Sequence, residues 1–152
     1  MKRALLLLWL GPTALFGQES LYLGAEACRD CHPKAFEAWS ASRHARAQSA
    51  LPPENAGTLR CLFCHGTDAQ KNLSSRRLDH VQCEACHGPG ARHVTLASTK
   101  DEKSPKPGGL EPVSVKTCLR CHTDVRSPRI RPFDYERSRE AIRHWETPAA
   151  VD

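Results

Sequence analysis

The chain has 152 residues, a formal net charge of +5 and a hydrophobic fraction of 39%. Lys2 and Arg3 precede a short apolar run that ends near Gly17, which predicts a secretory signal peptide over residues 1–17. Residues 18–152 then form one mature domain of charge about +3, which is +5 less the two lost charges. Its apolar content is too low for a large enzyme, a multidomain protein or a polytopic membrane protein, and it requires cross-links or a bulky apolar cofactor.

In chain order, the first predicted element of the mature domain is a helix over residues 33–47. It begins at a proline and carries Phe36, Ser40 and His44 on one face at four-residue steps. Loops are expected over residues 51–58 and 97–112, because both contain proline and glycine among polar residues. A second helix is expected over residues 133–146, with His144 near its end.

All eight cysteines fall into four Cys-x-x-Cys pairs, and a histidine directly follows each pair. This pattern is typical of c-type haem attachment. Two thiols three positions apart reach the two vinyl groups of one porphyrin edge, and the adjacent imidazole binds the iron. The sequence therefore predicts four haem c groups, each with its iron. They are held by Cys28, Cys31 and His32, by Cys61, Cys64 and His65, by Cys83, Cys86 and His87, and by Cys118, Cys121 and His122.

Two other interpretations of the cysteines remain. The spacing of Cys61, Cys64, Cys83 and Cys86 also fits a structural zinc site, and an even cysteine count in an exported chain fits a disulfide scaffold. Neither requires a histidine after every pair. Four haems also account for the small core, because the macrocycles themselves supply apolar interior. Their propionates would account for an excess of arginine over lysine, since guanidinium groups suit carboxylates. Nucleic acid is disfavoured as a partner by the short basic runs and the few aromatic residues.

The sixth iron ligand is expected to be histidine. The only methionine is Met1, which leaves with the signal, so methionine ligation is excluded in the mature protein. Four histidines lie outside the motifs: His44, His80, His93 and His144. On a continuous helix, His44 would lie roughly 18 Å from His32 at 1.5 Å per residue, so we expect it to bind a different haem.

Three blocks carry a resemblance to a known family. The first runs from Tyr22 through the first motif to Trp39-Ser40, Arg43-His44-Ala45 and Ala47, and the second is Val81-Gln-Cys83-Glu-Ala-Cys86-His87-Gly88-Pro89-Gly90 followed by His93. The third runs from the fourth motif, Cys118 to His122, through Phe133-Asp-Tyr135 to Ile142-Arg-His144. The chain resembles the tetrahaem c-type cytochromes of the cytochrome c-552/c-554 family over nearly its whole mature length. The resemblance implies a mainly α fold with extensive irregular loops wrapped around four haems in stacked pairs. It also implies distal ligand roles for His44, His93 and His144.

His80 has no counterpart in that pattern. It is expected to ligate the haem bound to His65, and the alternative is an iron with no second ligand. The sequence as a whole predicts periplasmic electron transfer through mostly bis-histidine haems, with redox proteins as donor and acceptor. The alternatives are a redox enzyme with one five-coordinate haem that binds a small nitrogen or oxygen species, and one unit of a haem-lined filament or membrane-associated complex. Peripheral association with membrane redox complexes and oligomer formation remain open.

Overall fold

The computed structural model of the protein describes residues 21–69, 76–98, 108, 110–123 and 133–144. The described elements are helices joined by turns and irregular segments, and these residues contain no β-strand. The prediction of a mainly α fold with extensive loops is confirmed. The signal peptide predicted over residues 1–17 lies outside the described residues.

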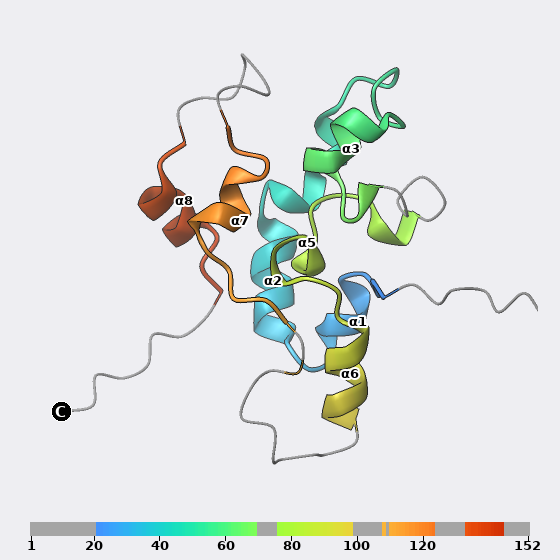
Figure 1. The fold of residues 1–152 in the computed structure, drawn as a ribbon, viewed down its shortest axis with the longest axis vertical. Helices are drawn as coiled ribbons and strands as arrows, with labels where there is room; N and C mark the ends of the chain where they lie inside the picture. The colour runs from blue at the N-terminus through green and yellow to red at the C-terminus, as the bar shows by residue number, and fades with distance from the viewer. Residues whose placement is uncertain (1–20, 70–75, 99–107, 109, 124–132, 145–152) are drawn as a thin grey trace, which may run out of the picture.

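The helices are short. They are α1 (Glu26–Arg29), α2 (Pro33–Ala41), α3 (Leu59–His65), α5 (Cys83–His87), α6 (Ala91–Ser98), α7 (Val115–Leu119) and α8 (Tyr135–Ala141), with single 3₁₀ turns at His44–Arg46, Gln48–Ala50 and Arg76–Leu78. In Figure 1, α2 and α5 lie near the centre, α3 lies above them, α1 and α6 lie below, and α7 and α8 lie to one side. Isolated helices of this length are marginal in water, so tertiary contacts must maintain them.

Local sequence signals explain several helix ends. Pro33 occupies the first turn of α2, where its missing N–H costs nothing. Ser114 and Thr117 form a reciprocal capping box at the start of α7. Before α8, the Asp134 side chain accepts a hydrogen bond of 3.0 Å from the Arg137 backbone N–H.

The predicted helix over residues 33–47 is wrong in extent. Helix α2 ends at Ala41, because Ser42 adopts an extended backbone conformation and its hydroxyl accepts a hydrogen bond from the Ala45 N–H. His44 therefore begins a separate 3₁₀ turn and does not share the α2 face with Phe36 and Ser40.

The other predicted boundaries shift less. The loop over residues 51–58 is confirmed, and α3 follows it directly. The loop predicted over 97–112 begins after Ser98, the end of α6, and residues 99–107 and 109 lie outside the described residues. Helix α8 ends at Ala141, before His144, and residues 145–152 are not described.

The protein interior contains very little aliphatic material. Among the described residues, the buried hydrophobic side chains are those of Ala25, Leu62 and Leu78. Three polar side chains are buried with them, those of Thr67, Gln82 and Glu84. So few buried apolar groups cannot offset the conformational entropy of ordering a chain of this length.

Candidate functional site

Each Cys-x-x-Cys-His motif lies in or directly after a short helix. Helices α3 and α5 contain the whole second and third motifs, whereas α1 and α7 contain the first cysteine of the first and fourth motifs and end one residue later. All eight cysteines are free thiols, and none forms a disulfide. The thiols are thus available for thioether bonds to a haem edge.

Cysteines of different motifs lie next to each other. The Cys28 thiol is hydrogen-bonded to that of Cys83, which lowers the pKa of Cys28 and raises that of Cys83. Burial, followed by the nearby Cys64, raises the pKa of Cys121 to about 12. Burial, followed by the charge of Cys118, raises the pKa of Cys86. The motifs are therefore neighbours in the order first, third, fourth, second, which differs from their order in the chain.

Backbone contacts support this order. The Arg120 guanidinium, within the fourth motif, donates a hydrogen bond to the Ala85 carbonyl within the third. The Cys121 thiol lies 3.8 Å from the Phe63 carbonyl oxygen in the second. The structure thus joins Cys83 to Cys28, and Cys64 to Cys121, rather than gathering the four cysteines of the zinc interpretation. No group of three or more His, Cys, Asp or Glu side chains that could hold a metal ion occurs within the described ranges.

Three motif histidines each face one of the remaining histidines. In every pair the two ring centroids lie 6.1 Å apart, although the angle between the ring planes varies from 24° to 78°. The pairs are His32 with His93, His44 with His122, and His87 with His144. His44 thus lies beside the fourth motif rather than the first, as the expectation that it serves another haem requires.

The spacing of these pairs fits one metal ion between two imidazoles. Metal–imidazole bonds are about 2 Å long and a ring nitrogen lies about 1 Å from its centroid, so two imidazoles on opposite sides of one metal have centroids roughly 6 Å apart. Rotating a ring about its bond to the metal changes the interplanar angle and leaves this distance unchanged. In each motif two cysteine thiols adjoin the histidine, and three of these histidines face a second imidazole. This set of residues therefore fits haem c.

Electrostatics favours the neutral form, which is the form that binds metals, for three of these imidazoles: His44, His87 and His122. Burial lowers the pKa of His44 first, and the charge of His122 lowers it further. Burial also lowers the pKa of His87, with a further contribution from His144. For His122, burial alone is the cause of a lowered pKa.

The remaining two histidines, His65 and His80, contact neighbouring backbone groups, of Ala47 and Gln48 respectively, in opposite ways. His65 Nδ1 lies 2.7 Å from the Ala47 carbonyl oxygen, which only accepts, so Nδ1 carries the proton and Nε2 keeps its lone pair. This is the arrangement of a metal-binding histidine. His80 Nδ1 instead accepts a hydrogen bond of 3.2 Å from the Gln48 backbone N–H, which places the proton of the neutral ring on Nε2. His80 in this arrangement presents a donor rather than a ligand.

The backbone also fixes His80 in place. Its φ of 68° lies in the left-handed region, which is costly for a residue other than glycine. The Thr67 hydroxyl donates to the His80 carbonyl at 2.8 Å, and the His80 N–H donates to the Gln48 side chain at 3.2 Å. Ligation of iron through His80 Nε2 would move the ring proton to Nδ1 and so require breaking the bond that Nδ1 accepts from the Gln48 N–H.

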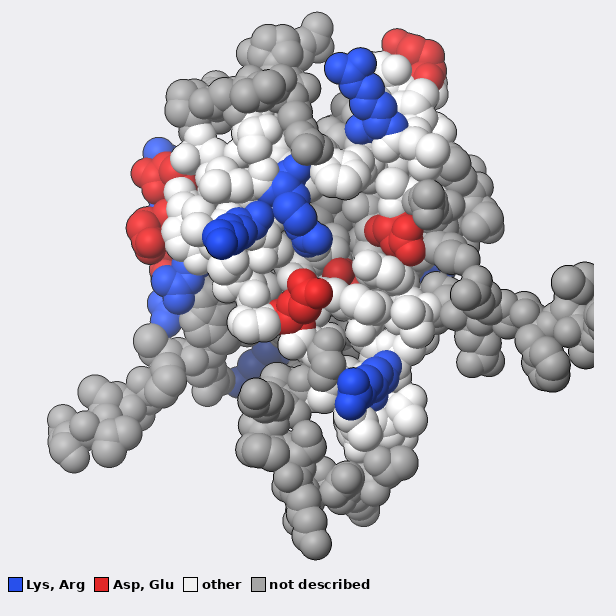
Figure 2. Space-filling model, in the orientation of Figure 1, with Lys and Arg blue, Asp and Glu red and all other residues white. Residues whose placement is uncertain are grey.

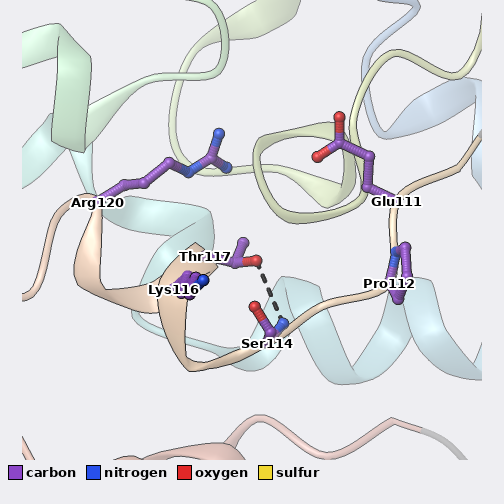
Figure 3. Close-up of a pocket in the computed structure, with 6 residues that line it drawn as sticks. All are labelled: Glu111, Pro112, Ser114, Lys116, Thr117 and Arg120. Carbon is purple, nitrogen blue, oxygen red and sulfur yellow. Dashed lines mark hydrogen bonds between the residues drawn. The ribbon is translucent and has the colours of Figure 1, made fainter.

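A hollow of about 480 Å³ lies beside α7, and its walls are lined by Glu111, Pro112, Ser114, Lys116, Thr117 and Arg120. Figure 3 shows Arg120 reaching across it toward the segment that contains α5, with Glu111 on the opposite side. Two cationic side chains next to the fourth motif suit the propionate carboxylates of a haem. Nearby in the chain, the buried Thr123 hydroxyl has no hydrogen-bond partner among the described residues.

Sequence reasoning missed two buried residues, Gln82 and Glu84. They flank Cys83, and together they accept hydrogen bonds from the backbone N–H groups of Leu23, Gly24 and Ala25, just before α1. In the sequence, the only indication that these two residues matter was their position within and next to the third motif.

Comparison with known proteins agrees with this geometry. The profile of the family described as cytochrome c554 and c-prime matches residues 27–88, which include three of the four motifs. The chain is also 29% identical over 106 residues to the C-type polyheme cytochrome OmcB of two strains of Geobacter sulfurreducens, DL-1/KN400 and PCA. Both matches support a multihaem c-type cytochrome family. They likewise support electron transfer by c-type haems.

The match to these relatives is partial. It covers 66% of this chain but only 14% of each OmcB chain. No solved structure is significantly similar to this chain. Within the described residues, no helix has the length and hydrophobicity needed to cross a membrane.

Proposed function

We propose that this cytochrome is exported to the periplasm and transfers electrons through four haems, three of them ligated by two histidines. The observation that carries the proposal is the common 6.1 Å spacing of the three imidazole pairs, each of which combines one motif histidine with one histidine from elsewhere in the chain. Ordinary aromatic packing has no reason to select that combination three times.

Haem c would supply a one-electron iron couple at each motif. The chain's own residues would hold the groups and set their spacing. Cysteine pairs would attach each haem, and the three paired sets of histidines would ligate three irons and leave no position there for a substrate. Arg120 and Lys116 would neutralise propionates beside α7.

The contacts between cysteines support one order of electron flow. The first and third motifs meet at Cys28 and Cys83, and the second and fourth meet at Cys64 and Cys121. Cys86 beside Cys118 joins the two halves. Electrons entering at the first motif would thus pass to the third and the fourth before they reach the second.

A second function is favoured at the haem of the second motif, which comes last in this order of electron flow. His65 is oriented as a ligand by the Ala47 carbonyl, whereas His80 presents Nε2–H in its present arrangement. We propose that the iron bound to His65 has an open position, and that a small nitrogen or oxygen species binds there. This favours the alternative expected from the sequence over ligation by His80.

The partners would be a donor and an acceptor redox protein. Figure 2 shows basic and acidic side chains interspersed on the visible face, which suits transient protein contacts. Association with a membrane redox complex and assembly into a filament are separate outcomes, and sizing of the purified protein distinguishes them from a monomeric carrier.

Intact mass spectrometry tests the proposal directly. Protein matured in a periplasm with a haem-attachment system should carry four haems and lack residues 1–17. The control is a Cys118→Ser/Cys121→Ser variant, which should carry three. Fully matured wild-type protein with three or fewer haems would contradict the proposal.

A further inference from the structure

The carboxylate of Glu84 is buried, and both of its oxygens accept hydrogen bonds. Only 4% of the residue is exposed, and no ion pair of the described residues includes it. Its oxygens accept hydrogen bonds from three backbone N–H groups: Leu23 at 2.9 and 3.0 Å, Gly24 at 2.8 Å, and Gly90 at 2.7 Å. Burying a carboxylate is costly unless such donors replace water, so these bonds hold the charge in place.

The glycines allow this close approach. Gly24 has a φ of +86°, and a Cβ there would meet the Arg77 carbonyl oxygen at 2.8 Å. A Cβ on Gly90 would lie 3.0 Å from Glu84 Oε1. Both positions therefore require a residue without a side chain for the backbone to surround the carboxylate.

Gln82 makes further hydrogen bonds to the segment that precedes α1. Its side-chain oxygen accepts a hydrogen bond of 2.5 Å from the Ala25 N–H, and its amide nitrogen donates to the carbonyls of Arg77 and Asp79 at 2.8 and 2.7 Å. Gln82 and Glu84 thus bind the three residues that lead into α1. They do so from either side of Cys83, the first residue of α5.

The consequence is a fixed relation between two haem-attachment helices. Helix α1 carries Cys28 and α5 carries Cys83, and their thiols are in hydrogen-bond contact. Any movement of the segment before α1 would separate these two attachment points. Electron transfer between two haems depends steeply on their separation, so this contact acts on the rate as well as on the fold.

We propose that Glu84 is a positioning residue that sets both the spacing and the reduction potential of the haems on the first and third motifs. This rests on the proposed function. A buried negative charge near an iron stabilises its oxidised form and so lowers its reduction potential. The charge lies where solvent cannot screen it, unlike the charges of exposed glutamates.

The test compares Glu84→Gln with Glu26→Gln in haem-loaded protein. Glu26 lies on α1, and its side chain is exposed beside Arg29. Removing the Glu84 charge should lower the ferric-to-ferrous ratio of one or two haems about tenfold at a fixed applied potential, which is an upward shift of about 59 mV for a one-electron couple. The Glu26 variant should shift far less. Equal titration curves for the two variants would overturn the proposal.

A second variant tests the proposal if Glu84→Gln prevents haem attachment. If Glu84→Gln yields no haem-loaded protein, Glu84→Asp keeps the charge and shortens the side chain. The proposal then requires a lower melting temperature than that of Glu26→Asp and slower electron redistribution after partial photoreduction. Unchanged values for both would overturn it. Intact mass reports haem number separately, so a failure of the four-haem proposal is distinguishable from a failure of the Glu84 proposal.

Discussion

The cytochrome has two regions that are held together differently. Among the described residues, all six buried side chains lie in the first region, residues 21–98, which includes the polar contacts around Thr67, Gln82 and Glu84. The second region comprises residues 110–123 and 133–144, and its helices α7 and α8 contain no buried residue. The family profile also falls within the first region, at residues 27–88.

The second region contacts the first mainly through histidine rings and single hydrogen bonds. Two of the three imidazole pairs cross between the regions, those of His44 with His122 and of His87 with His144. The Glu111 N–H donates to the His87 carbonyl at 2.8 Å, and the Arg120 guanidinium donates to the Ala85 carbonyl. On the proposed ligation, iron between the rings would hold the second region in place, whereas direct polypeptide contacts organise the first.

The largest predicted effect follows from removing haem altogether. Chain produced without a haem-attachment system should show no cooperative thermal transition, because the buried aliphatic groups alone cannot offset chain entropy. Far-UV circular dichroism during heating measures this, with haem-loaded protein as the control. A cooperative transition in the haem-free chain, at the temperature of the loaded protein, would contradict the account.

The next effect tests the direct contacts of the first region. Leu62 is 1% exposed, so Leu62→Ala should lower the free energy of unfolding by about 2–5 kcal/mol through lost burial and a cavity. Leu21 is 65% exposed, and Leu21→Ala should change the free energy by about 0.5 kcal/mol or less. Denaturant unfolding of the two loaded variants gives the comparison, and equal losses would show that the burial of Leu62 does not stabilise the first region.

A smaller effect is expected at Thr67. Its buried hydroxyl accepts from the Gln82 N–H and donates to the His80 carbonyl, both at 2.8 Å. Thr67→Val leaves both groups unpaired and should cost about 1–3 kcal/mol in the free energy of unfolding. Thr95, exposed on α6, provides the control Thr95→Val. If both valines give the same unfolding curve, the polar contacts do not stabilise the first region.

The most local effect concerns single haems. His44→Ala should convert one haem from low to high spin without loss of covalent haem, because the distal ligand is separate from the thioether bonds. The haem affected should be the one on the fourth motif, not the one on Cys28 and Cys31. His93→Ala and His144→Ala should each act in the same way, whereas His80→Ala should create no new high-spin haem. Optical spectra and intact mass measure both quantities.

The angles between the paired imidazole rings provide a further test of which distal histidine pairs with which motif. The rings of His32 and His93 are inclined by 24°, and those of His87 and His144 by 78°. Nearly parallel ligand planes give a rhombic low-spin electron paramagnetic resonance spectrum, and nearly perpendicular planes give one feature at high g. His144→Ala should therefore remove a high-g signal, and His93→Ala a rhombic one. The reverse assignment would show that the rings are paired differently.

The sequence predicted the chemistry of the site better than its geometry. The motifs and the count of eight histidines identified the haem class because those patterns are local in the chain. The partner of each distal histidine depends on irregular segments, and Ser42 alone breaks the helix that was expected to carry His44. Glu84 was missed because its role depends on residues 60 or more positions away. His80 could not be assigned without the hydrogen bond that fixes its tautomer.

Carbon monoxide titration of the fully reduced protein tests the central claim most directly. Three irons are ligated by two histidines in this account, and the iron on His65 has an open position. The account predicts one carbon monoxide bound per chain, both in the wild type and in His80→Ala, since His80 is not a ligand. No binding in the wild type, or more than one equivalent per chain, would contradict it.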